Sequence, residues 1–221
     1  MSQTKKPEIR RAILTGAYDL FRQKGYATTT TAQIAKRAKV SESNVYVYFD
    51  SKAQILFEIY EPWLRERVIA LRRKLAKVEA PRERVRLILK LLWQRLPSDE
   101  GGFSNNLMQC LSTLSRTGHY KSELLLSVEK DIEEMILSSA PEERRDQIRH
   151  GRLVHILMMA QDGFVMNYHL DPKNRAQSAS VELMCDFILG PERSGKGART
   201  ARPNAPPAQR SASVRRSAPA R

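Results

Sequence analysis

Two short helical segments, separated by a tight break at Lys39 and Val40, lie within residues 30–49, and this arrangement fits few folds. Thr30 or Thr31 can cap the first segment and Ser41 the second, because a hydroxyl there accepts from a backbone amide one turn later. Two helices that cross steeply over so short a turn need a small residue where they meet, and Ala35 lies at that position. The stretch therefore predicts a helix-turn-helix.

Helical periodicity continues along the chain as far as Gly190. A first helix is expected from Pro7 to Gly25, and a long helix that bends or breaks at Pro62 should follow Ser51. Five further helical patterns follow, the last two over residues 143–170 and 173–189. Because no segment alternates as a strand would, we predict an all-α fold of about nine helices.

The charge is concentrated at the two ends of the chain. Residues 1–52 hold ten Lys/Arg and four Asp/Glu, and residues 191–221 hold eight and one, whereas residues 53–190 are nearly neutral. The Pro-, Ser- and Ala-rich composition of residues 191–221 predicts a disordered basic tail. We predict a DNA-binding domain over residues 7–52, a helical ligand-binding and dimerisation domain over 53–190, and this tail.

Several kinds of site and location are not expected. Cys110 and Cys185 lie far apart, so two buried free thiols are favoured over a disulfide. The four histidines lack metal-ligand spacing, and no catalytic constellation or cofactor motif is present, so no metal, no cofactor and no enzyme activity are expected. No secretory signal and no membrane span are evident, which favours a cytoplasmic protein.

Residues 7 to about 60 resemble the TetR family of bacterial transcriptional regulators. The shared features are the helix-ending Gly25, the threonine run 28–31, Ile34-Ala35, Ala38, Val40-Ser41, Tyr46, Tyr48-Phe49 and Ser51-Lys52. Lys39 departs from the pattern, since the family usually has glycine there. Because that turn favours a positive φ, lysine should cost about 1 kcal/mol.

The resemblance implies that residues 42–48 enter the major groove of double-stranded DNA and that two subunits form a homodimer. Short polar side chains near the two helix starts can reach base edges, whereas capped amides and flanking residues can hold phosphates. The expected DNA-binding residues are Thr30, Thr31, Gln33, Lys39, Ser41, Glu42, Ser43, Asn44, Tyr46, Val47, Tyr48 and Lys52. Tyr46 and Tyr48 are alternatively core aromatics.

The resemblance also implies a small-molecule pocket in the helices after residue 52, and a dimer interface in the last two helices. Aromatic and methionine side chains are the pocket candidates, although core packing is their alternative role: Trp63, Trp93, Phe103, Met108, His119, Tyr120, His155, Met159 and Phe164. The expected dimer interface is Leu153, Ile156, Leu157, Val181, Met184, Phe187 and Ile188, with internal packing as the alternative.

These features predict a sequence-specific regulator of transcription, in the form of a ligand-released repressor that binds a palindromic operator as a homodimer. A ligand-independent architectural protein that uses both basic ends is the alternative. It would show little sequence preference and a steep salt dependence.

Overall fold

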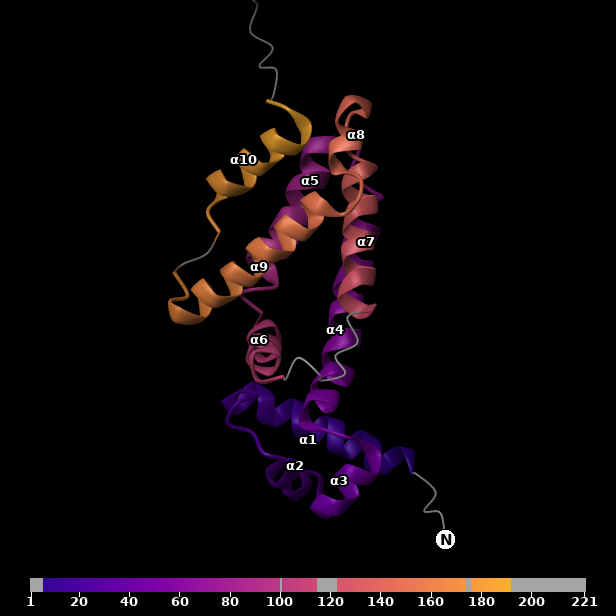
Figure 1. The fold of residues 1–221 in the computed structure, drawn as a ribbon, viewed down its shortest axis with the longest axis vertical. Coiled ribbons are helices and arrows are strands. Elements are labelled where there is room, and N and C mark those ends of the chain that lie inside the picture. Colours follow the sequence, from indigo (N-terminus) through magenta and orange to yellow (C-terminus); the bar gives the residue numbers. More distant parts are fainter. Residues whose placement is uncertain (1–5, 100, 115–122, 174–175, 192–221) are drawn as a thin grey trace, which may run out of the picture. The chain divides into compact units, whose positions relative to one another are not determined.

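The computed structural model describes residues 6–99, 101–114, 123–173 and 176–191, and these residues form helices and no strands (Figure 1). The predicted all-α fold is therefore confirmed. The helices are α1 (Pro7–Lys24), α2 (Thr31–Ala38), α3 (Glu42–Tyr48), α4 (Lys52–Leu75), α5 (Pro81–Lys90), the π-helix η1 (Leu91–Arg95), α6 (Phe103–Thr113), α7 (Glu123–Leu137), α8 (Glu142–Ile148), α9 (Arg152–Leu170) and α10 (Ser178–Leu189).

The first three helices pack around their own cluster of buried side chains. Ile13 and Phe21 of α1 meet Ile34 of α2 and Val45 of α3, and the first residues of α4 close the cluster. Gly16 permits the close approach of α2, because a Cβ there would lie 3.3 Å from the backbone nitrogen of Ala38. A side chain at Gly16 would therefore push α2 away from α1.

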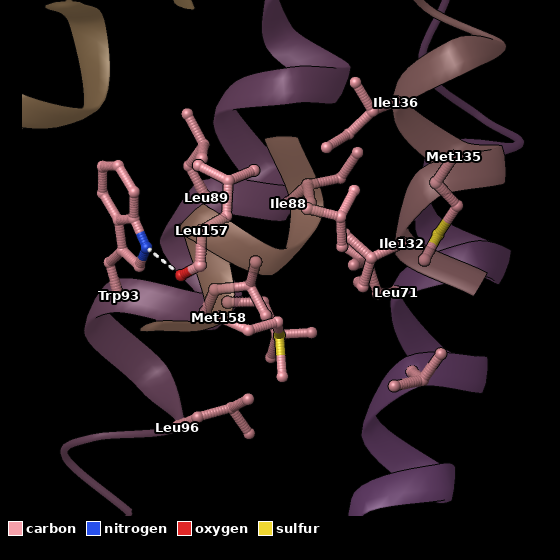
Figure 2. Packing of buried hydrophobic residues seen from close by; sticks show 14 of the residues in the cluster. Leu71, Ile88, Leu89, Trp93, Leu96, Ile132, Met135, Ile136, Leu157 and Met158 are labelled. Carbon is pink, nitrogen blue, oxygen red and sulfur yellow. Dashed lines mark hydrogen bonds between the residues drawn. The ribbon is translucent and has the colours of Figure 1, made fainter. Parts of the chain in front are cut away.

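A larger cluster joins α4 to α10 and η1, and Figure 2 shows part of it, with residues of α4, α5, η1, α7 and α9. Ile88 and Leu89 of α5, Ile132 of α7 and Leu157 of α9 are completely buried in it. The indole nitrogen of Trp93 donates to the carbonyl oxygen of Leu157 at 3.1 Å, which satisfies the polar atom of a buried ring. This cluster fixes α9 against η1.

Two helix boundaries differ from the sequence prediction. The expected helix over 143–170 is broken into α8 and α9, because His150 and Gly151 both adopt positive φ, at 75° and 72°. Conversely, α4 continues through Pro62 without interruption. The break at Gly151 accounts for the additional α-helix.

The described residues form one compact unit. The predicted boundary between residues 52 and 53 lies at the start of α4, whose side chains enter both clusters, and it stays a prediction. The predicted tail lies outside the described residues, apart from Pro191. Cys110 and Cys185 are buried free thiols, as predicted.

Candidate nucleic-acid interface and effector cavity

The turn between α2 and α3 has the geometry that the sequence predicts. Lys39 ends α2 in the left-handed conformation, with φ 58° and ψ 40°. The amide of Val40 donates to the carbonyl of Ala35 at 3.0 Å, and this bond closes the turn. Ser41 then begins α3, and its hydroxyl accepts from the amide of Asn44 at 3.2 Å. The chain therefore contains a helix-turn-helix.

We expect the change Lys39→Gly to raise the free energy of unfolding by about 0.5–1 kcal/mol, since glycine has no Cβ to strain the positive φ. Lys36→Gly is the matched control, because Lys36 lies inside α2 and glycine there should destabilise. Urea unfolding of both variants measures the two effects. A destabilised Lys39→Gly variant would contradict the strain argument.

The structure selects Thr30 as the cap of α2, in a reciprocal capping box. The amide of Gln33 donates to the Thr30 hydroxyl at 3.2 Å, and the amide of Thr30 donates to Oε1 of Gln33 at 3.0 Å. Lys24 also donates to Oε1 of Gln33. This oxygen already accepts two hydrogen bonds. The Gln33 side chain is therefore held at the start of α2, which it stabilises, before any contact with DNA.

One face of α3 is exposed to solvent, while Val45 on the opposite face is buried. Most of the predicted DNA-binding residues are exposed: Thr30, Gln33, Lys39, Ser41, Glu42, Ser43, Tyr46 and Val47. Thr31, Asn44, Tyr48 and Lys52 are half-buried. The structure thus brings these twelve residues together around α3 and the start of α2 and α4. Their contacts with DNA stay a prediction.

Hydrogen bonds order several of these side chains. The Thr31 hydroxyl donates to Oε1 of Glu42 at 2.8 Å and lies 3.2 Å from the hydroxyl of Tyr46. The Tyr46 ring is 53% exposed, so it is not a core aromatic. The hydroxyl of Tyr48 accepts from the amide of Lys6 at 2.8 Å, which ties the start of α1 to α3.

Lys52 lies at the start of α4, where its ammonium group binds the protein's own backbone. It donates to the carbonyl oxygens of Tyr26 and Thr29, each at 2.8 Å, and lies 4.0 Å from the centre of the Tyr26 ring. Burial lowers its pKa. The structure therefore gives Lys52 a positioning role in the loop before α2, in addition to the phosphate contact predicted for it.

A cavity of about 60 Å³ lies between α4, η1, α6, α7 and α9. Its lining is mainly aliphatic, with Leu64 of α4, Leu92 of η1, Leu107 of α6 and Val128 of α7 among its residues. Such a volume is small beside the several hundred Å³ of a typical ligand site. A ligand larger than a few atoms would therefore have to displace these helices or their side chains.

Of the nine predicted pocket residues, the structure places Met159 at this cavity. The ring of Trp63 packs against Phe103 and that of Trp93 against Phe164, each pair in a tilted arrangement with ring centres 5.3 Å apart. Met108 is half-buried on α6 and absent from the lining, and exposed His155 lies 3.3 Å from a carboxylate oxygen of α7. His119 and Tyr120 lie outside the described residues.

Helix α6 contains a clamp that the sequence analysis missed. The side chain of Asn106 accepts from the amide of Tyr26 at 2.6 Å and donates to the carbonyl of Phe21 at 3.1 Å. Gln109 accepts from the amide of Ala27 at 2.9 Å. A polar Asn between the apolar positions of α6 was the available signal, since a buried amide needs partners.

The predicted dimer interface is partly wrong. Leu157, Val181 and Ile188 are at most 2% exposed and belong to the core of their own chain, so they cannot contact a partner. Leu153 and Met184 are half-buried. Ile156 and Phe187 are exposed at 60% and 65%. Periodicity identified apolar helices but did not identify which apolar side faces inward.

The described parts of the chain offer neither a metal site nor a membrane-spanning helix. No group of His, Cys, Asp or Glu there could hold a metal ion. No helix among the described residues is long and apolar enough to cross a bilayer.

Comparison with known proteins agrees with this geometry. The family model of bacterial regulatory proteins of the tetR family matches residues 13–59. The HTH-type transcriptional regulator HbdR of Aromatoleum sp. (strain CIB) is 50% identical over 50 residues, which are 23% of this chain and 22% of HbdR. The chain thus matches less than a quarter of that relative's length.

Solved structures match most of the chain at low identity. The fatty acid degradation regulator FadR of Bacillus halodurans is 19% identical, with a TM-score of 0.59 over 86% of this chain and 99% of that one. FadR of Thermus thermophilus, solved in complex with lauroyl-CoA, is 20% identical, with a TM-score of 0.55 over 85% and 99%. These matches show a shared fold across both clusters.

Proposed function

Because the chain belongs to the TetR family of bacterial regulatory proteins, we propose that it regulates transcription as a homodimer on a palindromic operator. The single observation that carries the proposal is the exposed face of α3 beside a closed helix-turn-helix turn. An α-helix held in this way fits the major groove, and two-fold symmetry places two such helices on successive turns of DNA.

The exposed apolar side chains of α9 and α10 support a dimer. Ile156, Met159, Met166 and Leu170 recur along one side of α9, and all are more than half exposed. Leu183 and Phe187 of α10 are exposed at 58% and 65%. Soluble monomers rarely expose so many large apolar side chains on successive helices, whereas homodimer interfaces bury them.

Ion pairs hold α10 against α5 in an orientation that leaves Phe187 exposed. Arg82 of α5 pairs with Asp186 at 2.8 Å and with Glu182 at 3.1 Å, and Arg86 also binds Glu182. These arginines lower the pKa of Glu182. The charged side of α10 thus faces α5, and the proposed interface side stays free.

The proposed effector is a small molecule that widens the cavity, and α4 and α6 would carry the effect to the DNA-binding helices. Leu64 of α4 and Leu107 of α6 line the cavity, while Leu56 and Cys110 of the same helices belong to the N-terminal cluster. A ligand that moves either helix would therefore change the separation of the two α3 helices in the dimer. FadR of Thermus thermophilus binds lauroyl-CoA in the same fold.

Selection of bound duplexes from a random DNA pool tests the proposal. A sequence-specific regulator enriches an inverted repeat and binds it about 1,000-fold or more tightly than random DNA. Equal binding of both, with a steep salt dependence, would instead favour the architectural alternative.

Asn44 provides a residue-level test of base recognition. Its side chain lies in the first turn of α3, where base edges are within reach. We expect Asn44→Ala to cost about 1–3 kcal/mol on the selected sequence and less on random DNA. Asn105→Ala on α6, where the side chain is half-buried and away from α3, is the matched control. Equal losses on both DNAs would make Asn44 a backbone contact.

A further inference from the structure

The polar residues described at the cavity are acidic or neutral. Among the described residues that line it, Glu129 of α7 and Gln161 and Asp162 of α9 carry a carboxylate or amide, Tyr60 of α4 carries a phenol, and none is a lysine, arginine or histidine. Around them the wall is aliphatic, with Leu64, Val68 and Met158 among its members. The described lining therefore combines an apolar wall with two carboxylates and one amide, which we call the negative end.

The side chains of Gln161 and Asp162 have no polar partner among the described residues of the protein. The Gln161 side chain is 5% exposed, and within the described residues neither it nor the Asp162 carboxylate has a hydrogen bond or ion pair. Both groups keep some contact with solvent, since no fully buried side-chain nitrogen or oxygen among the described residues lacks a partner, and a ligand that replaces this solvent must supply a partner of its own. Burial raises the pKa of Asp162, which reflects the same lack of a compensating charge.

Glu129 adds to the negative end but is already engaged. One of its carboxylate oxygens lies 3.3 Å from Nδ1 of His155, on the outer side of α9. Asp162 is therefore the free carboxylate of the cavity. An anionic ligand would be repelled here, whereas a cation would offset the desolvation of Asp162.

We propose that the cavity binds a lipophilic cation, with an alkyl or aryl body against the leucine, valine and methionine side chains and an ammonium group at Asp162 and Gln161. A primary ammonium group suits this end because its N–H groups can donate to the Asp162 carboxylate and to the carbonyl oxygen of Gln161. Binding of this ligand class does not depend on the proposed function. Only its expected effect on DNA binding rests on that function. The cavity must widen to admit such a body.

Three probes with the same eight-carbon chain isolate the charge: octylammonium, octyl sulfate and 1-octanol. Calorimetric titration of the full chain should show that the ammonium ion binds about tenfold or more tightly than either other probe. Comparable affinity for octyl sulfate would overturn the proposal, because the same apolar wall is available to all three.

Asp162→Asn should weaken binding of octylammonium about tenfold and leave that of 1-octanol within about twofold. Asp146→Asn is the matched control, since the side chain of Asp146 on α8 is 98% exposed and absent from the cavity. Glu129→Gln, with a smaller expected loss, keeps the test valid if Asp162→Asn does not fold. An unchanged preference for the ammonium ion in both variants would overturn the proposal.

DNA binding separates this inference from the proposed function. Binding of the ammonium probe without release of DNA would contradict regulation by the cavity and support the ligand class. Sequence-specific DNA binding with no preference for the ammonium probe would contradict the ligand class alone.

Discussion

Ile156→Glu together with Phe187→Glu should convert the dimer to a monomer and weaken binding to a two-half-site operator about 100-fold or more. In the proposed interface each glutamate would lose its hydration. Two-fold symmetry would also bring the same negative charges of the partner subunit into that interface. Folding should survive, because both side chains are more than half exposed. Light scattering gives the mass, and a gel-shift titration gives the affinity.

Ile69→Glu together with Leu126→Glu is the matched control, since these exposed apolar side chains lie on α4 and α7. That variant should remain a dimer. If the variant with Ile156→Glu and Phe187→Glu keeps the mass of a dimer, the interface lies elsewhere on the chain. A charge at Leu157 would not test the interface, because it would be buried and would unfold the core.

Asn106→Ala should lower the free energy of unfolding by about 2–4 kcal/mol, which is a large part of the stability of a domain. It leaves the buried amide of Tyr26 without an acceptor and removes packing volume, whereas the carbonyl of Phe21 keeps the amide of Gly25 as a donor. If enough protein stays folded, affinity for a two-half-site operator should fall about tenfold, because α1 is no longer fixed to α6.

Urea unfolding and binding to one and two half sites measure these effects. Asn105→Ala is the matched control, since Asn105 is only half-buried and makes no hydrogen bond with a described residue. Asn106→Asp keeps the acceptor for Tyr26 and loses the donor, so its stability should lie between those of the parent and Asn106→Ala. Equal stability of all four proteins would show that the clamp does not hold the two clusters together.

The helix-turn-helix was predictable because each of its signals is local. Ser41 and Ser51 cap the helices that follow them, Gly25 ends α1 with φ 82°, and Lys39 adopts the positive φ expected of its position. Each depends on hydrogen bonds or sterics within one turn of the chain, so no knowledge of distant contacts is needed.

The cavity, the clamp and the interface were harder to predict because they depend on distant contacts. Aromatic residue type identified buried positions such as Trp93, but a cavity forms where side chains of several helices leave space. Helix α9 is apolar on two sides, so its periodicity did not distinguish Leu157 in the core from Ile156 on the surface. The end of α8 depends on His150, a residue that gives no warning of a positive φ.

The π-helix Leu91–Arg95 has a consequence for changes in chain length. Each residue turns an α-helix by about 100°, so one inserted residue would normally rotate everything after it out of register. In η1 the amide of Leu96 reaches back to the carbonyl of Leu91 at 3.0 Å, and this wider turn absorbs one residue. Leu91, Leu92 and Leu96 all line the cavity as a result. A homologous chain one residue shorter in this segment can return to regular α-helix and keep its neighbours in phase, so an alignment gap here implies no change of fold.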